Sequence, residues 1–172
     1  MIRTPHELFA HRLRTMLWVE QRLVDEILPM LYDHVHSTGL KYAIEHHTFE
    51  TRQHVRTLER ALHLLGEPAE PAQSAALAGL KAEHDELMRL VDQDREDVAD
   101  LMHAEVIAAS EHQELAVYES LIATANALGE EEIAIMLEET REQEACALET
   151  ANRVAVELLA ENVESARLGF DA

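Results

Sequence analysis

Residues 101–125 read LMHAEVIAASEHQELAVYESLIATA and form the clearest helical segment of the chain. Glu111 lies near the middle of this segment, and neither Gly nor Pro interrupts it. Apolar side chains recur every three or four positions on the same face as Glu111, as in an amphipathic α-helix, at Leu101, Ala104, Ala108, Leu115, Tyr118, Ile122 and Ala125. The segment therefore predicts a long helix whose apolar face carries a carboxylate.

The rest of the chain has the composition of a helical protein. Its 172 residues are 47% hydrophobic and include only 5 Gly and 4 Pro, and the abundant Ala, Leu and Glu favour helices. Long alternating runs of Val, Ile and Thr, which are typical of strands, do not occur. The length suffices for one domain with a sizeable core. We therefore predict a single all-α domain over residues 1–172.

Capping residues and turn residues divide the chain into predicted helices. Thr4, Pro5 and Glu7 have the pattern of a helix start. Gly66 and Gly129 follow predicted helix ends. We predict helices over residues 5–36, 40–65, 75–89, 91–128 and 130–160, and fraying of the last ten residues.

The spacing of these helices predicts their topology. Residues 37–39 form a short turn, whereas residues 66–90 form a long crossover that contains the short helix. One long crossover between two helical hairpins is the ferritin-type connection. We therefore predict a ferritin-like antiparallel four-helix bundle, with a kink at Pro29 in its first helix. A short similarity between residues 50–53 and 139–142 indicates a duplicated hairpin.

The apolar stripe of each long helix carries one glutamate near its middle. A charged carboxylate in a bundle core costs on the order of several kcal/mol unless it is paired or binds metal. Counted from the nearest turns, at ~1.5 Å per residue, the four positions lie within roughly two helical turns of one level. The pattern therefore predicts one shared buried site, formed by Glu20, Glu50, Glu111 and Glu144.

A histidine accompanies one of these glutamates. His54 follows Glu50 by four residues and shares its helix face. Bundle di-iron proteins place one Glu on each of two helices and Glu-x-x-His on each of the other two. Here the spacing is Glu-x-x-x-His, and the last predicted helix has no histidine. We therefore predict an incomplete di-metal site with the ligands Glu20, Glu50, His54, Glu111 and Glu144.

Neighbouring residues are candidates for extra ligands or for hydrogen-bond partners of the ligands, namely Glu114, His47, His112 and Tyr118.

Single residues also have structural alternatives. His54 alone fits a hydrogen-bonded core histidine, Glu20 alone fits a pair with Arg22, and Glu144 alone fits a solvated flank. Cys146 is expected to be a small buried apolar group.

The charge of the chain limits its partners. It has 34 acidic and 14 basic residues and a formal charge of -20, so we expect it to repel nucleic-acid phosphates and anionic lipids. No apolar run approaches the ~20 residues of a membrane span, and the first residues lack the apolar core of a signal peptide. We expect no nucleic-acid or membrane partner and a cytoplasmic location.

Several segments match a known family. They are residues 7–9, 18–21, 28–29, 49–55, 64–66, 111–118 and 137–144. At residues 111–118, EHQELAVY in this chain, the family shows Glu-His-Tyr-Glu, an aliphatic residue, Ala, any residue and Tyr. Over nearly its whole length the chain therefore resembles the bacterial YciE/YciF-like ferritin-like proteins.

The resemblance implies a four-helix ferritin-like fold, a homodimer, a site for two metal ions and a role in stress physiology. The family's acidic ligands correspond to Glu20, Glu50, Glu111 and Glu144. The family often has acidic residues at three further positions, so one half of the site has fewer ligands here; the chain has Phe49, Gln143 and Leu148 at these positions.

Two functions are compatible with these residues. Oxygen-rich ligation with one or two imidazoles suits Fe and Mn better than structural Zn, so the first is a non-haem di-iron or iron–manganese protein. As an enzyme it would be an oxidoreductase that oxidises Fe²⁺ with O₂ or peroxide, or that dismutates peroxide. The second is a non-catalytic helical stress protein, a dimer with a degenerate metal site whose glutamates are protonated or paired with histidines.

Overall fold

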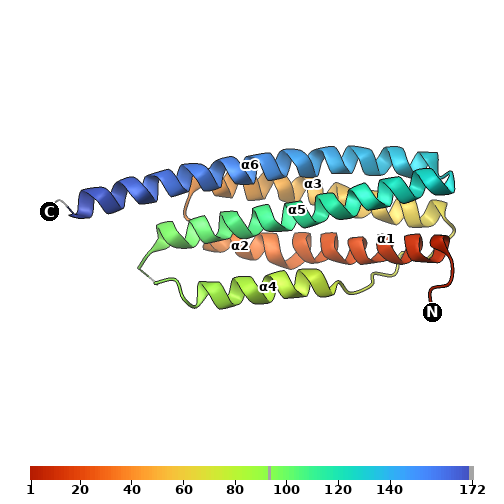
Figure 1. The fold of residues 1–172 in the computed structure, drawn as a ribbon, viewed down its shortest axis with the longest axis horizontal. Coiled ribbons are helices and arrows are strands. Elements are labelled where there is room, and N and C mark those ends of the chain that lie inside the picture. The colour runs from red at the N-terminus through yellow and green to blue at the C-terminus, as the bar shows by residue number, and fades with distance from the viewer. Residues whose placement is uncertain (93, 171–172) are drawn as a thin grey trace.

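The fold consists of long helices that run along the length of the molecule (Figure 1). The computed structural model describes residues 1–92 and 94–170, and this part of the chain contains no strand. In chain order the helices are α1 (Pro5–Arg22), the π-helical turn η1 (Leu23–Ile27), α2 (Leu28–His34), α3 (Thr38–Leu64), α4 (Ala75–Met88), α5 (Glu96–Leu128) and α6 (Glu131–Phe170). The prediction of an all-α protein is confirmed.

The long helices surround a common interior. α1 packs against α3, α3 against α6, α6 against α5, and α5 against α1, so the contacts close into a ring. α3 and α5 are joined by the crossover that contains α4, which lies on the outside of the other helices (Figure 1). Each long helix therefore turns one face to the same interior space. None of the helices in the described ranges is long and apolar enough to cross a membrane.

The first long helical segment, α1 to α2, differs from the predicted continuous helix over residues 5–36. It is interrupted at Leu23–Ile27 by a π-helical turn, where the Leu28 N–H donates to the Leu23 carbonyl five residues back. Pro29 lies directly after this turn, and a proline inside an α-helix lacks an N–H and clashes with the preceding turn. The wider turn therefore accommodates the proline, and α2 ends at His34.

The other helix boundaries agree with the predictions except at two places. α5 begins at Glu96 rather than residue 91; the Asp92 side chain accepts the Asp94 N–H, a local hydrogen bond that competes with helical ones. α6 continues to Phe170, beyond the predicted end at residue 160, and residues 171 and 172 of the segment predicted to fray lie outside the described residues. Neither Gly nor Pro occurs between residues 130 and 168 to end that helix.

The interior is apolar on both sides of its middle. Phe9, Leu13, Leu58 and Leu137 are buried toward one end, and Leu31, Leu40, Ile44 and Val154 toward the other. Between these layers lie buried polar and charged side chains. A low-dielectric surrounding of this kind strengthens every electrostatic interaction among them.

Candidate metal centre

Polar side chains gather in the middle of the interior, where the long helices meet. They fall on the same helix faces as the apolar core residues, because they follow those residues at intervals of three or four. The buried members are Glu20 from α1, His47 and His54 from α3, Glu111, Glu114 and Tyr118 from α5, and Glu144 from α6. The structure thus places most of the predicted site residues together.

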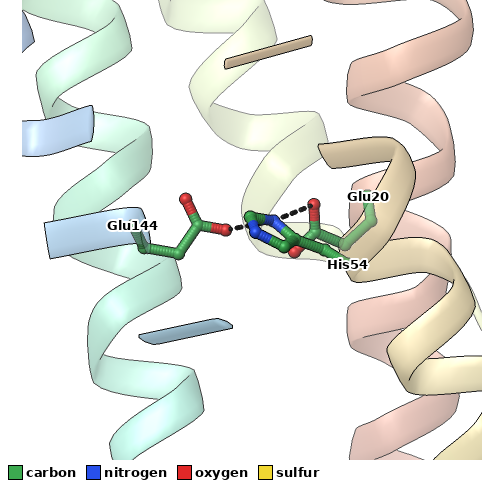
Figure 2. Close-up of side chains that lie close together, drawn as sticks. All are labelled: Glu20, His54 and Glu144. Atoms are coloured by element: carbon green, nitrogen blue, oxygen red, sulfur yellow. Dashed lines mark ion pairs between the residues drawn. The ribbon is translucent and has the colours of Figure 1, made fainter. Parts of the chain in front are cut away.

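The first group within this cluster consists of Glu20, His54 and Glu144 (Figure 2). His54 Nδ1 lies 2.9 Å from Glu144 Oε1 and 3.6 Å from Glu20 Oε2. One ligand atom from each residue lies within 4.8 Å of the others. Three helices therefore direct two carboxylates and one imidazole at the same small space.

The second group consists of His47, Glu111 and Glu144. His47 Nε2 lies 3.1 Å from Glu111 Oε1, and His47 Nδ1 lies 3.9 Å from Glu144 Oε2. The imidazole rings of His47 and His54 have centroids 6.5 Å apart. Glu144 belongs to both groups, so its carboxylate links them.

Many polar atoms of the cluster lack hydrogen bonds within the described part of the chain. They are Glu20 Oε2, both ring nitrogens of His47, His54 Nδ1, Glu111 Oε2, Glu114 Oε2 and both oxygens of Glu144. His54 Nδ1 and Glu144 Oε1 are close but not aligned as a hydrogen bond. An unsatisfied buried polar group costs about 1–3 kcal/mol, so the cluster is costly as it stands. These oxygen and nitrogen donors fit Fe or Mn, which bind carboxylates and imidazoles.

Hydrogen bonds outside the two groups hold the cluster in place. The Tyr118 hydroxyl donates to Glu20 Oε1, and the Ser110 hydroxyl donates to Glu114 Oε1 at 2.7 Å. His54 Nε2 lies 2.8 Å from Gln143 Oε1, and an amide oxygen only accepts, so Nε2 carries the proton. His54 therefore presents Nδ1 to the carboxylates, which is how a partner fixes the orientation of a metal-binding histidine.

The carboxylates of the cluster repel one another. Burial and the charge of Glu144 raise the pKa of Glu20 to about 7. Burial and the charge of Glu114 raise the pKa of Glu111 well above its usual value, and burial with the charges of Glu144 and Glu20 does the same for Glu114. Without a cation, part of the cluster therefore holds protons.

The pKa values of the two histidines and of Glu144 shift in different directions. Burial disfavours the charged form of His54, but its close contacts with Glu144 and Glu20 outweigh burial and raise its pKa to about 11. Burial would raise the pKa of Glu144, yet the contact with His54 and the charge of His47 lower it. Burial lowers the pKa of His47, so His47 is neutral and able to bind a metal ion.

Other predicted residues lie at the edge of the cluster or outside it. Glu50 is largely but not fully buried and belongs to neither group, and its Oε2 lies 3.2 Å from His46 Nδ1. His112 is exposed, because it follows Glu111 by one residue and points about 100° away around the helix; the structure places it outside the buried cluster. Cys146 is also exposed, contrary to the expectation of a buried thiol.

The structural alternatives have separate outcomes. Arg22 pairs with Glu26 and not with Glu20. Glu144 is fully buried rather than solvated. His54 does have a hydrogen-bond partner in the core, Gln143. Gln143 and Ser110 were not predicted as site residues, and only the adjacency of Gln143 to Glu144 in sequence hinted at its place.

Solved structures share this fold. YcfI from Rhodopseudomonas palustris is 28% identical, with a TM-score of 0.83 over 88% of this chain and 94% of that one. The E. coli stress protein YciF is 22% identical and has a TM-score of 0.84; the alignment covers 92% of this chain and 99% of YciF. A protein from Xanthomonas campestris is 21% identical, with a TM-score of 0.74 over 95% and 98%. No curated protein matches the chain.

The family resemblance has independent support. The family model described as a domain of unknown function, DUF892, matches residues 4–164. The match includes every residue of the buried cluster, and the similarity in fold to YciF agrees with the resemblance found in the sequence. The chain therefore belongs to the DUF892 family of YciF-like proteins.

Proposed function

We propose that the protein is a non-haem di-metal carboxylate protein, with two ions of iron, or of iron and manganese, at the centre of a ferritin-like four-helix bundle. The main support for this proposal is that Glu144 is shared by two groups of buried ligand atoms. Glu20, His54 and Glu144 would hold one ion, and His47, Glu111 and Glu144 the other. Glu114 is an additional oxygen donor beside them.

The chain's own residues suit oxidation chemistry at such a site. Bound iron would supply electron transfer to O₂ or peroxide, so the proposed reactions are Fe²⁺ oxidation and peroxide removal. The apolar layers on either side keep the dielectric constant around the site low. Glu111 and Glu114, whose pKa values burial raises, would hold or release protons next to the ions. The Tyr118 hydroxyl orients Glu20.

The setting of this function is proposed from the family. YciF is described as a stress protein, and we extend a role in oxidative or general stress, and a cytoplasmic location, to this chain. We also propose that it works as a homodimer of single-domain chains. Exposed apolar side chains outside the ligand cluster support an interface of this kind, since Val156 is 66% and Leu159 50% exposed.

The test is metal analysis of the full chain. Protein prepared without oxygen and incubated with Fe²⁺ should retain two ions per chain after removal of excess metal. Fe²⁺ should then be oxidised faster than in buffer when O₂ or peroxide is added. Protein that retains no Fe²⁺ and no Mn²⁺ contradicts the proposal.

A second function has one observation in its favour. The cluster partly satisfies itself, because His54 lies beside Glu144 and Tyr118 donates to Glu20. A non-catalytic helical protein would use these contacts only to set the register of its helices. It would bind no metal, and its melting temperature would not change with Fe²⁺, Mn²⁺ or Zn²⁺.

A further inference from the structure

A groove between α3 and α6 connects the protein surface with the buried cluster. Its volume is ≈ 250 Å³. Tyr42 and Cys146, both exposed, line it on the outside, and the buried side chains His47 and Glu111 also line it. The second ligand group is therefore in contact with a cavity whose other walls are accessible from solvent.

One face of α3 carries ligand atoms along this groove. His46, His47 and Glu50 all line it, and three or four residues separate each histidine from Glu50. The exposed fraction of the side chain falls from 60% for His46 to 12% for Glu50 and 7% for His47. Imidazole and carboxylate groups thus follow one another from the surface inward.

We propose that this groove, the uptake groove, is the path by which divalent cations reach the buried cluster, and that Glu50 with His46 is their first binding site. The inference rests on the proposed function. A cation must exchange its water for protein ligands, and full desolvation in one step is very costly. A carboxylate that is still partly exposed attracts the cation and replaces part of its water before His47 and Glu111 bind it.

A second cavity reaches the cluster from the other side but is less suited to cations. It lies beside α1 and α5, has a volume of ≈ 410 Å³, and touches the cluster at Glu114. The exposed Arg12 lines it and repels cations. The uptake groove also has an arginine, Arg153, but its guanidinium pairs with Glu157 at 3.1 Å.

The first experiment measures the rate of Co²⁺ binding by stopped-flow absorbance on the full chain. Co²⁺ serves as the probe because it binds oxygen and nitrogen ligands and is not oxidised in air. Glu50→Gln should slow binding about tenfold, the lower end of electrostatic effects on association, and leave the number of bound ions unchanged. Glu45→Gln is the control, because Glu45 is exposed on the same helix and lies outside the groove.

The second experiment blocks the groove. Cys146 is the chain's single cysteine, so a bulky maleimide modifies this position alone. Modification should slow Co²⁺ binding several-fold without changing the final amount bound. Cys146→Ser treated with the same reagent should bind at the unmodified rate. Cys146→Ser with Thr15→Cys, modified in the second cavity, should also bind at that rate.

Each outcome decides a separate question. If the unmodified protein binds no Co²⁺, the proposed function fails and the uptake groove fails with it. If it binds Co²⁺ and neither change slows binding, only the uptake groove is overturned. It is also overturned if Cys146 resists the maleimide in the native protein, if modification at position 15 slows binding instead, or if Glu50→Gln lowers the number of bound ions, which would make Glu50 a permanent ligand.

Discussion

Glu144 presents its two carboxylate oxygens to two different histidines of α3. Oε1 lies 2.9 Å from His54 Nδ1, and Oε2 lies 3.9 Å from His47 Nδ1. α6 supplies no histidine, and its single carboxylate at Glu144 belongs to both ligand groups.

Glu144→Gln tests this central position. The change keeps the size of the side chain and removes its charge, so the buried His54 loses its closest anion. Breaking a buried ion pair costs about 3 kcal/mol, which urea unfolding of the metal-free protein would measure. Metal analysis should show fewer than two ions. Glu142→Gln, with a side chain 73% exposed, is the matched control, and two ions retained by Glu144→Gln would contradict the bridging role.

Metal addition should raise thermal stability. A ligand that binds only the folded state, at 100 times its dissociation constant, contributes about 2.7 kcal/mol. For a chain of this length that corresponds to a rise in Tm of about 5–10 °C. Calorimetry with Fe²⁺ under anaerobic conditions, or with Mn²⁺, measures the rise, and a chelator should reverse it. An unchanged Tm with both ions supports the non-catalytic alternative.

His54→Ala should lower metal occupancy while leaving the helix content intact, because Ala is the better helix former. His54 is 1% exposed and faces Glu20 and Glu144. His112→Ala should leave occupancy unchanged, since His112 is exposed. Metal analysis with circular dichroism separates the two effects. Equal occupancy in both variants would remove His54 from the set of ligands.

The stability of the metal-free protein should fall as pH rises above 6.5. The pKa of His54 is raised from 6.5 to about 11, so folded His54 keeps a proton that the unfolded chain loses in this range, and that stabilisation disappears as pH rises. The lowered pKa values of His47 and His103 act only below 6.5, where they weaken the fold as pH falls.

The measurement is urea unfolding at a series of pH values above 6.5. Metal-loaded protein should show a weaker decline, because metal binding requires deprotonated ligands and strengthens with pH. A metal-free protein that gains stability over this range would contradict the charged state assigned to His54.

Tyr118→Phe should destabilise the metal-free protein with little change in packing. Tyr118 is fully buried, and its hydroxyl donates to Glu20. Without this donor a buried carboxylate oxygen is left unsatisfied, at a cost of about 1–3 kcal/mol. Chemical unfolding measures the loss, and bound metal should restore part of it. Tyr42→Phe, on an exposed ring, is the control.

Helical periodicity was sufficient to identify much of the cluster. Glu20, Glu111 and Glu144 recur at core spacing within long helices, so their burial follows from the sequence pattern alone. His47 and Glu114 were predicted only as neighbours of the ligands, yet both are buried at the centre. The contribution of a neighbour depends on how helices approach one another, which a one-dimensional pattern does not contain.

The remaining differences between the predicted and the observed structure have physical causes. Gln143 contacts His54 across 89 positions of sequence, and such a contact is set by the crossing of α3 and α6. The helical pattern places Glu50 on the apolar face of α3. In the structure Glu50 lies at the margin of that face, where it is partly exposed. The π-helical turn also has no sequence signature beyond Pro29.

That turn has a consequence for the tolerance of the chain to deletion. A π-helical turn is equivalent to one residue inserted into an α-helix. Leu28 follows Glu20 by eight residues and would point about 80° away in a regular helix, but the extra residue brings both side chains to the buried side. Deletion of the exposed Glu26 should therefore restore a regular helix without turning either α1 or α2 away from the interior. With Pro29 in place that helix would be strained by about 3 kcal/mol, whereas the same deletion combined with Pro29→Ala should fold normally and leave Glu20 where it is.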